Sequence, residues 1–283
     1  MYYKFCFYFI AGCLFCLGCT TKISDEKKIK YNRNNLFTKY ILIGNEHILW
    51  DTGAEGSVFF QDFASRKIKL GSKTLIDYNK QKSETPLFYS PSIVFDSMRI
   101  NNIHYLLVPE NEVAIGIKNY GIMGILGMNV IGKANWLIDF TDTTLYILKQ
   151  KNMPEITIIP NLLLPYQQIK VPIATLVIAE TAISNVIIDS GSEADLIFLE
   201  SDIEQINRYF PPIDITNYFS SSLYNDNIPE KKYKYQNITV NGYTFDELEI
   251  VQGKTNRLIG MGFFRKFNKV FLNTKEKEFC FYE

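Results

Sequence analysis

The sequence predicts a mostly β protein made of two similar β-barrel-like lobes related by pseudo-twofold symmetry. Short apolar and aromatic runs alternate with turn residues along most of the chain, which is typical of strands. Helical periodicity is weak, and one set of motifs occurs twice in the same order. The 283 residues suffice for two small lobes. We expect an N-terminal lobe over residues 35–152, a connection over 153–167 and a C-terminal lobe over 168–283.

The first 19 residues predict an export signal. A lysine near the start precedes an apolar run that is too short for a confident transmembrane helix. The run ends in Leu17-Gly18-Cys19, which resembles a bacterial lipoprotein signal in which the cysteine becomes the lipidated first residue. Cys13 is the alternative lipidation site, and a plain cleaved signal or a retained anchor are further alternatives. The resemblance implies an exported lipoprotein on the periplasmic face, the outer membrane or the cell surface.

The polar stretch over residues 20–34 follows the predicted signal. It carries many charges and few large apolar residues, so we expect a flexible tether between the membrane and the lobes. If Cys19 is lipidated, Cys280 is the only other cysteine of the mature chain, and no intramolecular disulfide can form.

An acidic residue, Asp51, interrupts the apolar stretch HILWDTGAEGSVFF. Ile48–Trp50 and Val58–Phe60 predict two short strands, and Asp51-Thr52-Gly53 lies between them. Burying a lone carboxylate costs several kcal/mol or forces it to take up a proton. An Asp-x-Gly sequence is also ordinary turn chemistry, so this motif alone indicates little.

The same arrangement occurs again 138 positions later. Val186–Ile188 lead into Asp189-Ser190-Gly191, and Leu196–Phe198 follow. If two lobes pack about a twofold axis, the two carboxylates meet and share one proton. The ionised carboxyl can then act as a base toward a water, and the protonated one can donate to a peptide carbonyl oxygen.

A second pair of motifs lies downstream of the two Asp turns. Ile125-Leu126-Gly127 and Leu258-Ile259-Gly260 each precede a methionine, and the segments align without a gap at an offset of 133. Between the paired motifs, Asn241-Gly242 predicts a β-hairpin turn. The best candidates for short helices are Gln61–Lys67 and Glu200–Arg208.

Composition excludes several classes of function. Lys plus Arg and Asp plus Glu are both 30, and no basic run is interleaved with aromatics, so nucleic acid is not an expected partner. The two histidines, His47 and His104, leave little room for a His-rich metal site or a Ser-His-Asp triad. We expect neither metal nor cofactor. The acidic residues Glu55, Glu193 and Asp195, just after the two Asp motifs, are interpreted as solvated loop charges.

The two Asp motifs, together with the two Gly segments, resemble those of the aspartic peptidases of the pepsin and retropepsin clan. The resemblance implies that Asp51 and Asp189 are catalytic. It also implies that Thr52 and Ser190 brace the active-site loops by hydrogen bonds, and that Gly53 and Gly191 let the loop backbone pass close to the carboxylates.

Two further expectations follow from the resemblance. The aliphatic-aliphatic-Gly segments should pack beneath the loops, and a β-hairpin flap should cover the cleft. The flap candidate lies between about Thr74 and Val94, where Tyr78 and Tyr89 are both available as the flap tyrosine.

The predicted function is that of a membrane-tethered aspartic endopeptidase. A water activated by the Asp51/Asp189 pair would hydrolyse peptide or protein substrates in a two-lobed monomer. One alternative is a catalytically silent member that uses its cleft to bind peptides or as a structural module. Another is a β-rich surface lipoprotein whose motif matches are accidental.

Overall fold

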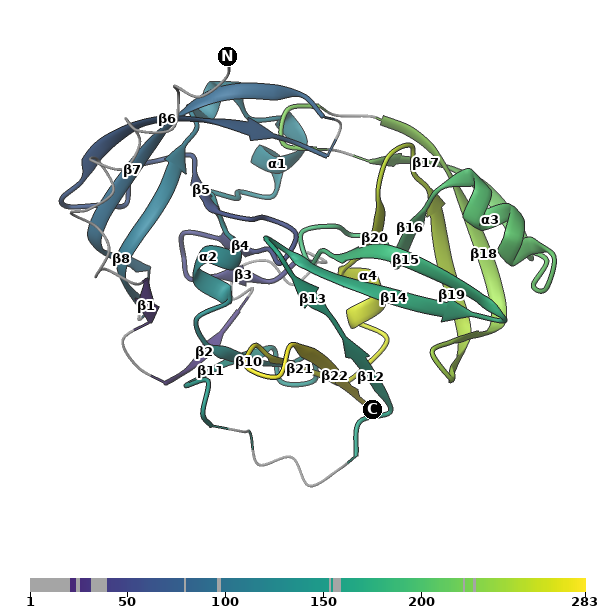
Figure 1. Ribbon diagram of the computed structural model, residues 1–283. Coiled ribbons are helices and arrows are strands. Elements are labelled where there is room, and N and C mark those ends of the chain that lie inside the picture. Colours follow the sequence, from purple (N-terminus) through teal and green to yellow (C-terminus); the bar gives the residue numbers. More distant parts are fainter. Residues whose placement is uncertain are drawn as a thin grey trace, which may run out of the picture.

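The computed structural model describes residues 21–23, 26–31, 40–78, 80–95, 98–152, 154, 159–220, 222–225 and 228–283. The predicted signal, with Cys13 and Cys19, lies outside the described residues. The prediction of a mostly β protein is confirmed, because strands dominate the described chain and form three sheets (Figure 1). No helix within these ranges is long and apolar enough to cross a membrane.

The first sheet is built from the N-terminal half and has the strand order β3-β4-β9-β5-β8-β7-β6, with β1 paired to β8. Its centre is short and fully buried, whereas β6 and β7 form a long hairpin that extends outward (Figure 1). Its strands are β1 (Lys22–Ile23), β3 (Leu42–Ile43), β4 (Ile48–Trp50), β5 (Ser57–Phe59), β6 (Ile68–Ile76), β7 (Lys82–Phe95), β8 (Met98–Leu107) and β9 (Gly124–Leu126).

A second eight-stranded sheet is built from the C-terminal half, in the order β13-β14-β15-β20-β16-β19-β18-β17. The predicted turn at Asn241-Gly242 is confirmed: it joins β18 to β19, and both residues have positive φ. The strands are β13 (Gln167–Gln168), β14 (Pro172–Ile178), β15 (Thr181–Ile188), β16 (Leu196–Phe198), β17 (Asp214–Ser220), β18 (Ile228–Val240), β19 (Tyr243–Gln252) and β20 (Arg257–Ile259).

The two eight-stranded sheets match strand for strand. From β3 to β6 and from β14 to β17, the strands follow one another in the same order across the sheet. In both, the strand that leads into the Asp turn pairs in parallel with the strand that contains the two aliphatic residues of the Gly segment: β4 with β9, and β15 with β20. The duplicated motifs therefore occupy corresponding places in two sheets of the same strand order.

A six-stranded sheet joins strands from both halves, in the order β12-β22-β21-β10-β11-β2. β10 of the N-terminal half pairs with β21 of the C-terminal half, so this sheet connects the two eight-stranded sheets (Figure 1). Its strands are β2 (Lys27–Lys30), β10 (Asn135–Asp139), β11 (Thr144–Leu148), β12 (Leu162–Pro165), β21 (Lys269–Asn273) and β22 (Glu278–Tyr282).

The prediction of a flexible tether over residues 20–34 is wrong for residues 27–31, which belong to this sheet or follow it directly. β2 is an edge strand that pairs with β11, and Ile29 and Tyr31 are buried. Their apolar side chains alternate with lysines, which is a strand pattern that compositional reasoning overlooked. The expected connection over residues 153–167 likewise contributes a strand, β12, which pairs with β22.

The helices are short. The prediction of a helix near Glu200–Arg208 is confirmed by α3, whereas the one near Gln61–Lys67 is wrong because that segment bends irregularly. There Asp62 accepts a hydrogen bond from Ala64 N and pairs with Lys67, which favours a turn. The helices are the 3₁₀ turn η1 (Glu110–Glu112), α1 (Ile115–Asn119), α2 (Met128–Ile131), α3 (Glu200–Asn207) and α4 (Met261–Phe264).

The largest apolar cluster runs through all three sheets. Trp50 lies directly before Asp51, is fully buried and packs against Trp136 of the joining sheet with ring centroids 6.0 Å apart. Burying large aromatic side chains is the main source of such a core's stability. The Asp51 turn is therefore anchored by the core that joins the two halves.

Candidate active site

The Asp51 turn is held between two parallel strands. Strand β4 ends at Trp50, and Asp51 N donates to Leu126 O of β9 at 3.1 Å. The Asp51 carboxylate accepts hydrogen bonds at Oδ1 from Gly53 N at 2.8 Å and Ala54 N at 3.1 Å. The backbone thus fixes the orientation of the Asp51 side chain.

The Asp189 turn repeats this geometry. Asp189 follows β15, and its N–H donates to Ile259 O of β20 at 2.8 Å. Its Oδ1 accepts from Gly191 N at 3.0 Å, and Ser192 N donates to Asp189 O at 3.1 Å. Two turns far apart in sequence therefore present a carboxylate in the same way.

The two carboxylates face each other, and each lies over the glycine of the opposite turn. A Cβ on Gly53 would lie 2.3 Å from Asp189 Cγ, and a Cβ on Gly191 would lie 2.6 Å from Asp51 Cγ. Only glycine leaves room for such an approach. Both aspartates are partly exposed, although Thr52 and Ser190 beside them are fully buried. The pair is thus open to solvent on one side.

Thr52 and Ser190 connect the two turns by reciprocal hydrogen bonds. Thr52 Oγ1 donates to Ile188 O at 2.7 Å and accepts from Ser190 N at 3.1 Å. Ser190 Oγ donates to Trp50 O at 2.8 Å and accepts from Thr52 N at 3.0 Å. Each hydroxyl therefore satisfies one buried N–H and one buried C=O of the other half.

The surroundings favour retention of a proton by the pair. Burial, followed by the nearby charge of Asp189 and a hydrogen bond with it, raises the pKa of Asp51 well above its ordinary value. Burial also raises the pKa of Asp189, against the lowering effect of the hydrogen bond with Asp51. Desolvation and the like charge both disfavour a doubly ionised pair.

The two Gly segments lie directly beneath the turns. Met128 N donates to Ala54 O at 2.8 Å, and Met261 N donates to Ser192 O at 2.7 Å. A Cβ on Gly127 would lie 2.6 Å from the backbone of Gly56, and one on Gly260 would lie 2.2 Å from Ala194 O. The backbones therefore touch at both positions, which supports each Asp turn from below.

Two hairpins approach each other at the free edges of the two eight-stranded sheets. The β6–β7 hairpin turns between Asp77 and Gln81, and the β17–β18 hairpin turns between residues 220 and 228 (Figure 1). Ser222 Oγ donates to Asp77 Oδ2, and Asn225 Nδ2 donates to Gln81 Oε1, both at 2.7 Å. The predicted flap region thus forms a hairpin, and the second hairpin was missed by sequence reasoning.

The two candidate flap tyrosines have different positions. Tyr78, at the hairpin tip, packs against apolar residues of the C-terminal half, and its hydroxyl donates to Glu230 Oε1 at 3.5 Å. Tyr89 lies farther along β7, where its ring contacts His104 and its hydroxyl donates to Asn102 Oδ1. Only Tyr78 reaches toward the carboxylate pair.

The three acidic residues after the motifs differ in environment. Glu55 is exposed and pairs with Lys73 and Lys170, as expected of a solvated charge. Glu193 is half-buried and accepts a hydrogen bond from Tyr120 at 2.8 Å; burial, aided by this bond, raises the pKa of Tyr120 to about 12.

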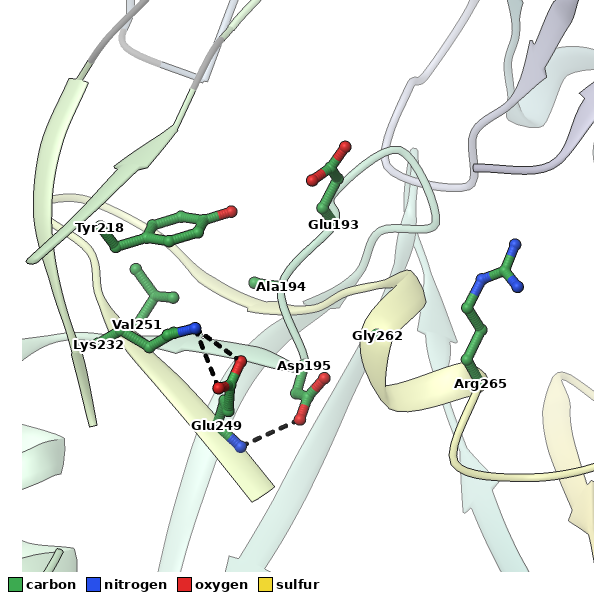
Figure 2. A pocket seen from close by; sticks show the side chains of 9 residues that line it. All are labelled: Glu193, Ala194, Asp195, Tyr218, Lys232, Glu249, Val251, Gly262 and Arg265. Atoms are coloured by element: carbon green, nitrogen blue, oxygen red, sulfur yellow. Dashed lines mark hydrogen bonds and ion pairs between the residues drawn. The ribbon is translucent and has the colours of Figure 1, made fainter. Parts of the chain in front are cut away.

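Asp195 contradicts the interpretation as a solvated charge. It is 9% exposed, accepts from Glu249 N at 3.0 Å and pairs with Lys266. It faces a small cavity of about 160 Å³, which is drawn in Figure 2. The cavity is lined by Glu193, Ala194, Asp195, Tyr218, Lys232, Glu249, Val251, Gly262 and Arg265.

No family model and no curated protein matches the chain. Within the described ranges, no cluster of three or more His, Cys, Asp or Glu side chains could hold a metal ion. The one cysteine in those ranges, Cys280, is buried and free.

Proposed function

We propose that the chain is an aspartic endopeptidase of the pepsin and retropepsin type, with two lobes related by a pseudo-twofold axis. Asp51 and Asp189 are the catalytic residues, and Thr52, Gly53, Ser190 and Gly191 support them. The observation that carries this proposal is the reciprocity of the two turns. Each glycine makes room for the opposite carboxylate, and each hydroxyl bonds to the opposite backbone.

The chemistry follows from a pair that holds one proton. The ionised carboxyl removes a proton from a water between the two, and that water attacks the peptide carbonyl carbon. The protonated carboxyl donates to the carbonyl oxygen. In the resulting gem-diol intermediate, the carboxyl that took the proton from water gives it to the amine nitrogen as the C–N bond breaks. The other carboxylate takes a proton back from a hydroxyl of the intermediate, which restores the singly protonated pair and leaves a carboxylic acid product. No step requires a cofactor.

A cleavage assay with matched variants tests this proposal. The full chain, in detergent, is incubated with a diverse peptide mixture at several pH values. Asp51→Asn and Asp189→Asn should each abolish cleavage while leaving unfolding cooperative, because an amide keeps the shape but cannot share the proton. Asp142→Asn, at an exposed carboxylate in a turn, is the control and should remain active.

Inhibitors add an independent criterion. Pepstatin should inhibit the wild type, and EDTA should not. Most activity retained in either dyad variant would exclude the mechanism. Peptides that bind without being cleaved would favour the alternative of a catalytically silent peptide-binding module.

We also propose that the protein is an exported lipoprotein anchored through Cys19 and working as a two-lobed monomer. Several acyl chains on one cysteine anchor far more firmly than one. Wild-type protein should then fractionate with membranes, and Cys19→Ala should release it or block its processing. If Cys13→Ala alone has this effect, Cys13 is the lipid site. If neither has it, the segment is a plain signal or a retained anchor.

A further inference from the structure

Tyr78 fills an apolar pocket that belongs to the other half of the molecule. It comes from the tip of the β6–β7 hairpin and packs against a cluster formed by four buried residues of the C-terminal half, Ala194, Ile197, Val251 and Leu258. Ile187 and Tyr218 border the same cluster. Tyr78 belongs to a hairpin of the N-terminal eight-stranded sheet. No strand pairing within the C-terminal sheet therefore places its side chain in this cluster.

The pocket lies beside the carboxylate pair. Ile187 precedes Asp189 by two residues and is paired in register with Leu258 in the parallel ladder below the turn. Burial raises the pKa of the Tyr78 hydroxyl, Glu230 raises it further, and the charge of Asp189 also acts on this hydroxyl. A peptide whose scissile bond lies at the pair therefore has a side chain within reach of this pocket.

Glu230 closes the far end of the pocket. This residue of β18 is 8% exposed, and its Oε2 has no hydrogen-bond partner among the described residues. Its Oε1 accepts a hydrogen bond from the Tyr78 hydroxyl at an oxygen–oxygen distance of 3.5 Å, which is much longer than the usual distance of about 2.7–2.8 Å for an O–H···O bond. Burial raises the pKa of Glu230, and the nearby hydroxyls of Ser220 and Tyr78 lower it, so hydroxyl donors at this end of the pocket stabilise the carboxyl.

Gly253 leaves space for a hydroxyl at that end. A Cβ at this position would lie 2.5 Å from Ile197 Cγ2 and 2.8 Å from the Tyr78 oxygen. Any side chain on residue 253 would therefore displace the phenol. The pocket is thus lined by apolar side chains and ends at the Glu230 carboxyl. Gly253 leaves room there for one hydroxyl oxygen.

In the corresponding pocket of the N-terminal half, Glu112 and Asp77 act on Tyr224 through their charges alone, and no carboxyl is hydrogen-bonded to this tyrosine among the described residues. There Leu223 and Tyr224 of the second hairpin tip pack against a cluster that includes Leu49, Val58 and Ile125. The hydroxyls near Tyr224 are those of Ser83 and Thr85, which lower its pKa against the raising effect of burial. The two pockets therefore differ in the polar group at their ends.

We infer that Tyr78 occupies the place of a substrate side chain, and that Glu230 makes this pocket select tyrosine in the peptide. The inference rests on the proposed function. A substrate tyrosine is not tied to the hairpin backbone, so it can approach Glu230 more closely than Tyr78 does. Burial raises the pKa of Glu230, which favours a neutral phenol over a lysine ammonium in acid solution.

A binding experiment tests the pocket without relying on cleavage. Tyr78→Ala in the full chain empties the pocket, and p-cresol, toluene and butylamine serve as probes in NMR titrations. We expect p-cresol to bind about tenfold more tightly than toluene, the scale of one good hydrogen bond. Wild type, whose pocket is filled, should show no such site.

Variants at Glu230 decide what causes the preference. Tyr78→Ala/Glu230→Leu should bind p-cresol and toluene equally, and the Glu230→Gln counterpart should keep part of the difference through its amide oxygen. Tyr78→Ala/Glu247→Leu, which removes a half-exposed carboxylate of β19 paired with Lys234, is the matched control and should keep all of it. Equal binding in Tyr78→Ala alone, or tighter binding of butylamine, would overturn the inference.

Cleavage separates this inference from the proposed function. In the wild type a bound peptide has to displace Tyr78 before its side chain enters the pocket. With otherwise identical peptides, a tyrosine next to the scissile bond should then raise kcat/KM about tenfold over phenylalanine, and Glu230→Leu should remove that ratio. Cleavage without a tyrosine preference refutes the inference alone. Absence of any cleavage, with p-cresol still bound, refutes the proposed function and with it the role of the pocket in substrate selection, and leaves only a phenol-binding pocket.

Discussion

Replacing Thr52 by valine removes one half of the hydrogen-bonded brace between the two Asp turns, while valine keeps the shape of the threonine side chain. The substitution deprives Ile188 O of its donor at 2.7 Å and Ser190 N of its acceptor at 3.1 Å. Thr52 is 0% exposed, so water can replace either hydrogen bond only if the contact between the two Asp turns opens. A buried polar group left unpaired costs about 1–3 kcal/mol, so Thr52→Val, which leaves two such groups unpaired, should destabilise the protein by about 2–6 kcal/mol.

Ser190→Ala should have a similar effect. It deprives Trp50 O of its donor and Thr52 N of its acceptor. The two substitutions share no strong hydrogen bond, since the two hydroxyl oxygens are 3.4 Å apart. Both substitutions nevertheless weaken the same contact between the two Asp turns. The double variant should therefore lose less stability than the sum of the single losses.

Urea unfolding, followed by tryptophan fluorescence, measures these losses, because Trp50 itself carries one of the affected carbonyls. An Asp51→Asn background prevents self-cleavage. Thr144→Val is the matched control: this threonine is also 0% exposed, but its hydroxyl makes a single hydrogen bond within its own turn, to Asp142 O at 3.2 Å. If Thr52→Val costs no more than Thr144→Val, the hydroxyls do not brace the two halves.

Three other predictions follow from the site. Because the folded pKa of Asp51 is raised, the folded state binds the proton more tightly than the unfolded state, so the free energy of unfolding of the wild type should fall as pH rises above about 4. In urea titrations Asp51→Asn should flatten this fall, and an unchanged pH profile would contradict the raised pKa. Gly191→Ala should lower kcat at least about 100-fold because its methyl meets the Asp51 carboxylate, whereas Gly56→Ala, with no atom within 4 Å of its Cβ, should not. Gln81→Ala should loosen the contact with Asn225 and speed amide exchange at both hairpin tips, whereas Glu84→Ala, within one hairpin, should leave the Asn225 tip protected.

The sequence was sufficient to predict the mostly β class and to identify the aspartates that the fold brings together. The reason is duplication: two copies of an Asp turn and a Gly segment at nearly equal spacing constrain each other, although one copy is ordinary turn chemistry. The assignment of Thr52 and Ser190 as braces came from the resemblance to the aspartic peptidases, once the duplicated motifs had indicated it. Each is the neighbour of an aspartate that must meet its counterpart.

Features that depend on contacts between distant segments were not predictable where no duplicated motif indicated the contact. Glu230 is one residue in an alternating strand, and only the docking of Tyr78 from the other half gives it a role. The charges of β2 resemble those of a tether, and pairing with β11 alone makes it a strand. Likewise, Gln61–Lys67 has a weak helical pattern that loses to the Asp62 turn and to the packing of Phe63 against Phe59.

Asp195 shows why duplicated positions have to be interpreted in pairs. In the N-terminal half, small Ser57 leaves room for Asn129, whose amide accepts from Ser57 N and donates to His104 O. In the C-terminal half, the aspartate occupies the place of Ser57 and accepts from Glu249 N.

The residue aligned with Asn129 is Gly262, where a Cβ would lie only 2.3 Å from Asp195 Oδ1. In each half, one polar side chain thus hydrogen-bonds to the backbone at the corresponding position of the neighbouring strand. In the N-terminal half this side chain is Asn129 of α2, and in the C-terminal half it is Asp195, directly before β16. Because the long side chain at one position requires a short one at the other, the aspartate is buried only in combination with the glycine. Its charge is then balanced by Lys266, which lies at 3.0 Å, rather than by solvent.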